Sequence, residues 1–255
     1  MASKMNVDSY VARHMYKVRG YLKLLDAQII AALGHAQIES RIRGDLAEIG
    51  VHHGKLFFIL ALLRQDGERL LAADLFEDDE GNRATVHAGR ESAFFTNSER
   101  LGIGIPSAEV YKGNSLDLTP EQIRQRVAQV RLFSIDGGHL YRHVENDIAL
   151  ASHVLHEKGV VIVDDFCTAR WPEVTFATYD FLRNDASEMT PFLVSKNKLY
   201  ICRKAAAPYY LNLVRTDSRF TFHPCENLSM IGADVVFIRH SMRQLVIDEL
   251  RARMS

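Results

Sequence analysis

The sequence predicts an α/β fold built on a doubly wound, mostly parallel sheet. Short apolar segments alternate with longer segments of helical periodicity, a pattern typical of helices on both faces of one sheet. Residues 160–163 are an unbroken Val/Ile run, which indicates a strand that is buried on both faces, as parallel strands are. Acidic residues or glycine turns follow several of these strands. In such sheets, ligands bind at the carboxyl ends of the strands.

The N-terminal segment 8–42 is predicted to be helical, because its apolar residues recur at roughly helical spacing. Gly44 and Asp45 interrupt that pattern. A buried strand, a helix and a second strand follow, and after an acidic turn at 77–82 come a short helix and a third strand. Their expected ranges are 46–51, 55–63, 69–76, 91–101 and 109–113.

Another helix is predicted to begin at Thr119, which can cap its N-terminus. Pro120 suits the first helical position, and Gln122 stands three residues after the cap. This helix is expected to run to about Val130. The later elements are a strand, a helix ending at Gly159, a strand, a helix and an antiparallel edge hairpin around 196–198. Their expected ranges are 132–136, 141–158, 160–164, 171–182, 192–195 and 199–203.

Three parts are expected along the chain: an N-terminal helical cover (1–44), a cofactor-binding domain (45–204) and a C-terminal extension (205–255) packed on the same domain. The extension is less regular over 205–240, and 241–253 has a helical pattern. The apolar N-terminal helices and the extension could form the interface of a homodimer.

Composition excludes several classes of protein. Hydrophobic residues make up 47% and charged residues 25%, as in an ordinary globular protein. A net charge of −1 gives no attraction to nucleic acid or to an anionic membrane, and the longest apolar run, 56–63, is too short to span a bilayer. The three cysteines are widely spaced and form no disulfide framework. A small-molecule substrate and a cytoplasmic location are therefore expected.

A glycine turn follows the first predicted strand. Glu48, Gly50 and Gly54 stand in the pattern E-x-G-x-x-x-G between a strand and a helix. Glycine lets the backbone turn sharply and approach a ligand, and the helix N-terminus favours polar or anionic groups. A purely structural turn is the alternative. His52 occupies the place of the middle glycine in the dinucleotide fingerprint, which argues against a pyrophosphate ligand.

Two further strand ends could contact a nucleoside. Asp74 follows Gly50 by 24 residues and could accept both ribose hydroxyls of an adenosine cofactor. It could equally be a solvated turn residue. Ser115, in a Gly-Asn-Ser sequence after the third strand, could line the adenine, although this sequence is also an ordinary turn.

Three carboxylates are the most specific feature. Asp136, Asp164 and Asp165 end two predicted strands, and carboxylates gathered in one crevice repel each other unless a cation neutralises them. Oxygen ligands suit Mg²⁺, Ca²⁺ or Mn²⁺ better than zinc. Alternatively, Asp136 caps a turn and the pair is solvated. His139 lies next to the site and could act as a base at neutral pH.

These residues resemble those of class I S-adenosylmethionine-dependent methyltransferases. The chain is most similar to metal-dependent O-methyltransferases of the macrocin (macrolide sugar) type, and more distantly to catechol O-methyltransferase. The resemblance runs from about Gly44 to Arg203 and is most specific over 135–139 and 163–165. It implies a Rossmann-like sheet, S-adenosylmethionine as cofactor and a magnesium ion.

The resemblance also implies roles for individual residues. Glu48 and Gly50 would hold the methionine end of the cofactor, Asp74 the ribose, and Ser115 would lie near the adenine. Further predicted cofactor contacts are Gly54 and Asp136. The three aspartates Asp136, Asp164 and Asp165 would bind Mg²⁺. His139 would be the general base, where the catechol enzymes have a lysine.

The implied reaction is direct transfer of a methyl group to a hydroxyl oxygen of a sugar, natural product or catechol. Four alternatives stay open. The first is a nicotinamide-dependent oxidoreductase, which would need a glycine at position 52, and the second is a hydroxylase, because some relatives are described as hydroxylases of antibiotic scaffolds. The third is a non-catalytic binding protein, which would have lost the carboxylates or the base, and the fourth is an enzyme that methylates nitrogen or carbon. The acceptor itself is not evident from the sequence.

Overall fold

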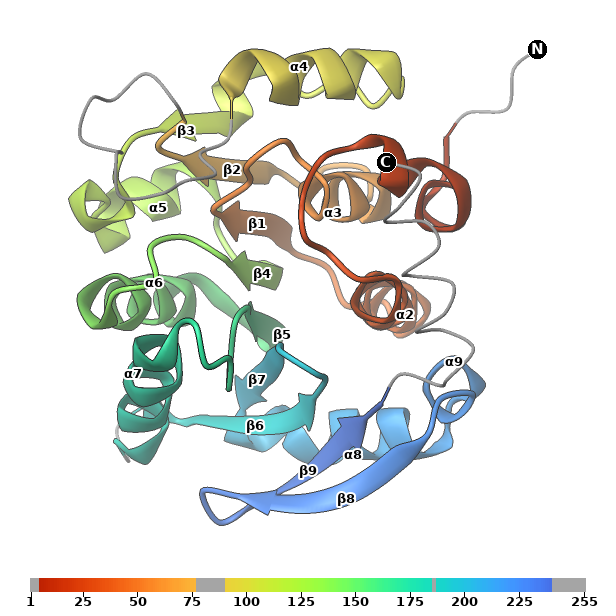
Figure 1. The fold of residues 1–255 in the computed structure, drawn as a ribbon, viewed down its shortest axis with the longest axis vertical. Helices are drawn as coiled ribbons and strands as arrows, with labels where there is room; N and C mark the ends of the chain where they lie inside the picture. The colour runs from red at the N-terminus through yellow and green to blue at the C-terminus, as the bar shows by residue number, and fades with distance from the viewer. Residues whose placement is uncertain (1–4, 77–89, 185–186, 240–255) are drawn as a thin grey trace.

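The fold is described by a computed structural model over residues 5–76, 90–184 and 187–239 (Figure 1). Within these ranges, nine strands form one sheet in the order β3-β2-β1-β4-β5-β7-β6-β9-β8. The first five strands of that order are mutually parallel, and β7 runs antiparallel to β5. The strands are β1 Asp45–Ile49, β2 Leu70–Asp74, β3 Val110–Lys112, β4 Val130–Ile135, β5 Leu155–Val163, β6 Met189–Val194, β7 Leu199–Arg203, β8 Cys225–Met230 and β9 Ala233–Ile238.

Helices cover both faces of the sheet, so the predicted doubly wound architecture is confirmed. In Figure 1, α5, α6 and α7 lie on one side of the sheet, and α2 and α3 lie on the other. The α-helices are α1 Val7–Ser9, α2 Leu24–Glu39, α3 Phe57–Leu63, α4 Glu91–Arg100, α5 Pro120–Arg126, α6 Tyr141–Val154, α7 Pro172–Arg183, α8 Ala207–Thr216 and α9 Ser218–Thr221. No described helix is both long and apolar enough to cross a lipid bilayer.

Each face of the sheet has its own hydrophobic core, because successive strand side chains point to opposite faces. Leu132 and Ile162 belong to the core under α2 and α3. Phe133 and Val161, one residue along each strand, belong to the core under α6 and α7. The two central strands are thus buried on both sides, as the Val/Ile run predicts.

The predicted start of the helix after Thr119 is confirmed in atomic detail. The Thr119 hydroxyl accepts a hydrogen bond from the Gln122 N–H at 3.2 Å, and the Gln122 side chain accepts one from the Thr119 N–H at 2.8 Å. Pro120 is the first helical residue. The helix ends at Arg126 rather than near Val130, because Val127 is extended and Val130 already begins β4.

The predicted helix 141–158 is too long. It ends at Val154, and β5 starts at Leu155, which pairs with Val130. Gly159 is therefore a strand residue and not the end of a helix. A Cβ at Gly159 would lie 2.6 Å from the Val130 carbonyl oxygen. This glycine lets β4 and β5 approach each other where their register shifts.

The predicted N-terminal helix 8–42 is interrupted. A short helical segment ends at Lys17, and α2 begins at Leu24. The intervening segment 18–23 contacts the turn before α3, where the Lys55 ammonium donates a hydrogen bond to the Gly20 carbonyl at 2.8 Å. A cover that the sequence predicts as continuous helix therefore contains an extended segment beside the sheet.

The sheet continues beyond the predicted hairpin. β6 and β7 form that hairpin, but β9 pairs with β6 in parallel and β8 then forms the edge. The region 205–240 is thus more regular than its sequence suggests, and it contributes α8 and a second hairpin. The predicted acidic turn at 77–82 and the helix at 241–253 lie outside the described residues. The division into three parts stays a prediction.

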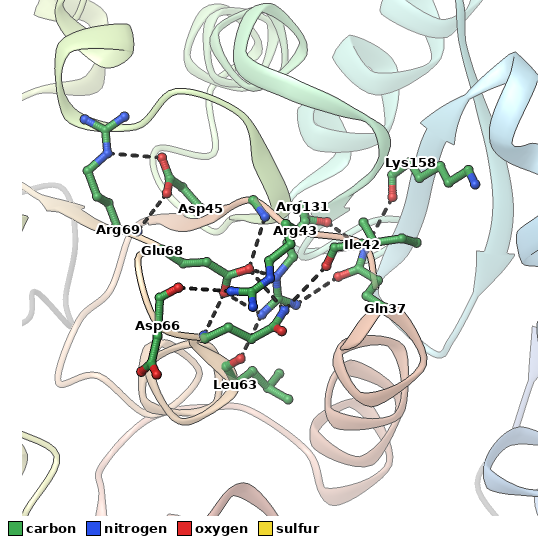
Figure 2. Close-up of polar contacts among 12 residues, drawn as sticks. Gln37, Ile42, Arg43, Asp45, Leu63, Asp66, Glu68, Arg69, Arg131 and Lys158 are labelled. Carbon is green, nitrogen blue, oxygen red and sulfur yellow. Dashed lines mark hydrogen bonds and ion pairs between the residues drawn. The ribbon is translucent and has the colours of Figure 1, made fainter. Parts of the chain in front are cut away.

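A buried ion pair ties the N-terminal ends of the strands together (Figure 2). The Arg131 side chain has no exposed surface, and its Nε and Nη2 donate to the two carboxylate oxygens of Glu68, each at 3.0 Å. Its other nitrogen donates to Gln37 at 3.1 Å, and Nη2 also donates to the Leu63 carbonyl at 2.7 Å. Asp45 accepts backbone hydrogen bonds from Arg69 and Ala128 nearby.

Candidate active site

A pocket of about 520 Å³ lies at the carboxyl ends of β1, β2, β4 and β5, the edge where α/β sheets bind ligands. Two other segments help to line it: 20–22 from the N-terminal cover, and the loop after β5 with Thr168 and Trp171. The structure brings together on its wall the predicted site residues Glu48, Gly50, Asp74, Ser115, Asp136, His139, Asp164 and Asp165.

One predicted cofactor residue lies away from the pocket wall. Gly54 has a φ of 91°, and a Cβ there would lie 2.4 Å from the Phe58 ring. Its glycine is explained by packing. Gly50, in contrast, has a φ of 87° and approaches β4 so closely that a Cβ would lie 1.9 Å from the Asp136 carbonyl oxygen. A side chain at Gly50 would push apart the two strand ends that form the floor of the pocket.

Glu48 is a buried carboxyl group on the pocket wall. It is 2% exposed, and one oxygen accepts a hydrogen bond from the Ser134 hydroxyl at 3.3 Å. The other oxygen has no hydrogen-bond partner among the described residues. Burial raises the pKa of Glu48 to about 8, against the lowering effect of Lys198. The group is thus poised to take a proton or to receive a cationic ligand.

Glu48 should therefore make stability depend on pH. Its pKa in the folded chain lies above the ordinary 4.5, so its contribution is complete below pH 4.5 and is lost as the pH rises through about 8. Glu48→Gln lacks the titrating group and should not lose this stability. The difference in unfolding free energy, Glu48→Gln minus the unmodified chain, should therefore rise by a few kcal/mol between about pH 5 and 9, at about 1.4 kcal/mol per pKa unit. Urea unfolding of both proteins across this range measures it, and parallel curves would contradict it.

Asp74 is a fixed acceptor and not a solvated turn residue. Its two carboxylate oxygens accept hydrogen bonds from the N–H groups of His52 at 2.7 Å and Phe76 at 2.8 Å. Burial raises its pKa, and these bonds oppose the rise. A carboxylate can accept about four hydrogen bonds, so capacity remains for a ligand. Ser115 is buried too, and its carbonyl accepts a hydrogen bond from Asn146.

Asp136, His139 and Asp165 form a compact cluster, in which one potential ligand atom from each lies within 4.8 Å of the others. His139 Nε2 lies 3.1 Å from an Asp165 oxygen and 3.9 Å from an Asp136 oxygen. The imidazole also stacks on Trp171, with ring centroids 4.3 Å apart. Burial works to raise the pKa of Asp165, but His139 and Lys198 outweigh it and the pKa is lowered.

Asp164 is held differently from its two neighbours. It lies 2.5 Å from the ammonium of Lys198, a lysine with a side chain that is only 2% exposed. Burial disfavours the charged lysine, but Asp164 and Asp136 outweigh it and raise the pKa of Lys198. The pKa of Asp136 is also raised, by burial and then by repulsion from Asp164. Sequence reasoning missed Lys198, because a lysine in a hairpin turn is normally exposed to solvent.

The fold matches that of known methyltransferases. The O-methyltransferase NovP superposes with a TM-score of 0.58 at 18% identity, over 71% of this chain and 80% of that chain. CalS11, a TDP-rhamnose 3′-O-methyltransferase, gives 0.52 at 15% identity over 79% and 88%. An O-methyltransferase from Bacillus cereus in complex with SAH gives 0.50 at 16% identity over 79% and 90%. At these identities the likeness concerns the fold.

Sequence comparison matches part of the chain to a known family. No curated protein matches the chain. A family model described as a methyltransferase domain matches residues 47–166, which run from within β1 to just past β5 and include the acidic strand ends. The matched segment thus contains most of the pocket wall that the resemblance predicts. Residues 47–166 therefore match a methyltransferase domain, and the chain shares the fold of known O-methyltransferases.

Proposed function

We propose that this chain transfers a methyl group from S-adenosylmethionine to a hydroxyl oxygen of a small molecule, with the help of a divalent cation. The observation that carries the proposal is the composition of one pocket. Glu48, with a buried carboxylate oxygen that no described residue pairs, and the fixed acceptor Asp74 lie on its wall together with the Asp136–His139–Asp165 cluster. The first two suit a cofactor, and the cluster suits an acceptor oxygen.

The cofactor-binding residues fit the two ends of S-adenosylmethionine. Glu48 would receive the methionine ammonium, because its second oxygen is buried and has no hydrogen-bond partner in the described part of the chain. Gly50 lines the same pocket and would lie beside that end of the cofactor. Asp74 would accept the ribose hydroxyls, and Ser115 would lie beside the adenine. When bound, the cofactor supplies the methyl group on its sulfonium centre.

The carboxylates fit a hard divalent cation. Asp136, Asp164 and Asp165 all line the pocket, and one buried ammonium, that of Lys198, offsets only one of their charges. Oxygen ligands of this kind suit Mg²⁺. When bound, the ion would bring two neighbouring acceptor oxygens together and acidify one hydroxyl. Acceptors with adjacent oxygens, such as sugar diols and catechols, suit such a site.

His139 is placed to remove the acceptor proton. Its hydrogen-bonding contact with Asp165 and its stacking on Trp171 fix the orientation of the ring. A base held in this way needs no reorganisation at the moment of transfer. Holding the reacting groups in position can contribute about 7–11 kcal/mol in well-oriented systems. Segment 20–22 and the loop at 168–171 would then enclose the acceptor.

A matched pair of acceptors tests the chelating site. With labelled S-adenosylmethionine and Mg²⁺, we expect transfer to 3,4-dihydroxybenzoate, or to a methyl glycoside with adjacent cis hydroxyls. The corresponding 3-hydroxybenzoate, which lacks the second oxygen, should react at least about a hundredfold more slowly, since oriented binding is lost. A chelator should stop the reaction. Equal rates on both acceptors, unaffected by a chelator, would contradict the role of the cation.

His139→Ala should lower turnover about 10²–10⁴-fold near neutral pH, the range that general-base catalysis contributes. Activity should recover in part at higher pH, as the acceptor hydroxyl ionises without help. A pH–rate profile of the variant measures both effects. His153→Ala, at an exposed position in α6, is the matched control and should keep the normal profile. A His139→Ala profile of unchanged shape would count against this base.

A further inference from the structure

Lys198 is an unusual feature of the pocket. Its backbone is fixed in the turn between β6 and β7, where the Lys198 carbonyl accepts a hydrogen bond from the Ser195 N–H at 2.9 Å. From this turn its side chain lies almost completely buried beside Asp164, with the ammonium 2.5 Å from one carboxylate oxygen. A buried charge of this kind is tolerated only when it is paired.

The second oxygen of Asp164 is also engaged. It accepts hydrogen bonds from the side-chain amide of Asn197 at 3.0 Å and from the Asp165 N–H at 2.8 Å. The exposed fraction of the side chain is 13% for Asp164, compared with 36% for Asp136 and 23% for Asp165. All three aspartates line the pocket, but Asp164 is the least exposed of them and both of its oxygens are engaged by protein donors.

The net charge of these groups also suits a site with only two free carboxylates. With all three aspartates ionised, the three carboxylates and the Lys198 ammonium carry a net charge of −2, which one divalent cation neutralises. Without the lysine, the same crevice would carry −3 and would hold a cation more tightly. The Lys198 ammonium therefore determines how many carboxylates are free to bind a metal, and it determines the net negative charge that the metal meets.

We propose that Lys198 is a built-in counter-ion that holds Asp164 out of the metal's ligand set, so that Asp136 and Asp165 bind the cation. This inference rests on the proposed function and deepens it. Lys198 is then a positioning residue, because it acts through Asp164 and not on the acceptor. Asp164 then helps to position Asp165, because it accepts hydrogen bonds from the Asn197 side chain and from the Asp165 backbone N–H.

A charge-conserving double variant tests this assignment. Asp164→Asn/Lys198→Gln removes the pair together and leaves Asp136 and Asp165 in place. Calorimetric titration of this double variant with Mn²⁺ should give an affinity within about threefold of that of the unmodified chain, because no metal ligand is lost. Asp165→Asn should lose at least about tenfold, as expected for a direct carboxylate ligand. A loss of more than threefold in the double variant would overturn the inference.

The single variant Lys198→Gln gives a second readout. It frees a carboxylate and adds a negative charge to the crevice, so Mn²⁺ should bind at least about tenfold more tightly. Weaker binding would show that the lysine only supports the fold, and would also overturn the inference. If this variant fails to fold, the double variant still decides the question, because it leaves no unpaired charge from this pair.

One further titration distinguishes failure of the Lys198 inference from failure of the proposed function. Titration of the same samples with S-adenosylhomocysteine reads the cofactor site alone. If the cofactor product binds but the unmodified chain takes up no Mn²⁺, the inference is overturned, while the cofactor assignment stands. If neither binds, the proposed function fails as well.

Discussion

Asp136→Asn is expected to lower methyl transfer by about a thousandfold or more while S-adenosylhomocysteine affinity changes by less than about tenfold. Asp136 directly follows β4 and lines the pocket next to His139 and Asp165. The variant removes a charge that the site needs to hold a cation, and electrostatic stabilisation by a metal contributes several kcal/mol, with each 1.4 kcal/mol worth about tenfold in rate. Initial rates with an acceptor that the unmodified chain methylates, and a parallel cofactor titration, measure the two effects.

A conservative variant elsewhere provides the control. Asp180→Asn removes the carboxylate that accepts a hydrogen bond from Tyr141 at 2.9 Å on the exposed surface of α7. Its rate and cofactor affinity should stay unchanged. If Asp136→Asn keeps normal activity in the presence of a chelator, the site does not use a metal and the account of the carboxylates is wrong.

Arg131→Met should destabilise the chain by about 3–5 kcal/mol, the usual effect of breaking a buried ion pair. The substitution keeps much of the side-chain volume but leaves Glu68, with only 4% of its side chain exposed, without its partner. Gln37 would lose a donor as well. Figure 2 shows how these groups converge on the guanidinium. Urea unfolding followed by circular dichroism measures the change.

Two further variants separate pairing from packing. Arg131→Met/Glu68→Gln removes both charges and should recover a substantial part of the loss, because no buried charge is left alone. Arg219→Met breaks two more exposed ion pairs, with Glu39 at 2.7 Å and with Asp217 at 2.6 Å, and should cost at most about 1 kcal/mol for each. Equal losses for Arg131→Met and Arg219→Met would show that burial of the first pair does not matter.

Much of the pocket could be predicted because its residues follow recognisable strands. The Val/Ile run of β5 places Asp164 and Asp165 at a strand end, and parallel pairing with β4 brings Asp136 beside them. The capping signal at Thr119 is equally local. Local patterns of this kind predict the fold correctly, because the residues that form the pattern are also the ones that are buried or hydrogen-bonded in the structure.

The missed features depend on contacts between distant parts of the chain. Lys198 looks like a solvated turn residue until the turn between β6 and β7 lies against β5, where Asp164 offers a partner. Arg131 lies just before the expected strand 132–136, and its partner Glu68 is 63 residues away. Neither pairing leaves a periodic pattern in the sequence.

The element boundaries failed for related reasons. The helical pattern of α6 continues past Val154, but pairing of Leu155 with Val130 extends β5 at the expense of the helix. β9 is recognisable only once β6 offers an edge for parallel pairing. In both places, a sheet contact remote in sequence overrides the local preference.

Calorimetric titration with S-adenosylhomocysteine, in the presence of Mg²⁺, tests the central claim most directly. The account predicts one-to-one binding in the micromolar range, with the ammonium of the ligand received by Glu48, so Glu48→Gln should bind much more weakly. Absence of binding to a folded sample would contradict the methyltransferase assignment and leave the carboxylate cluster without a reaction to serve.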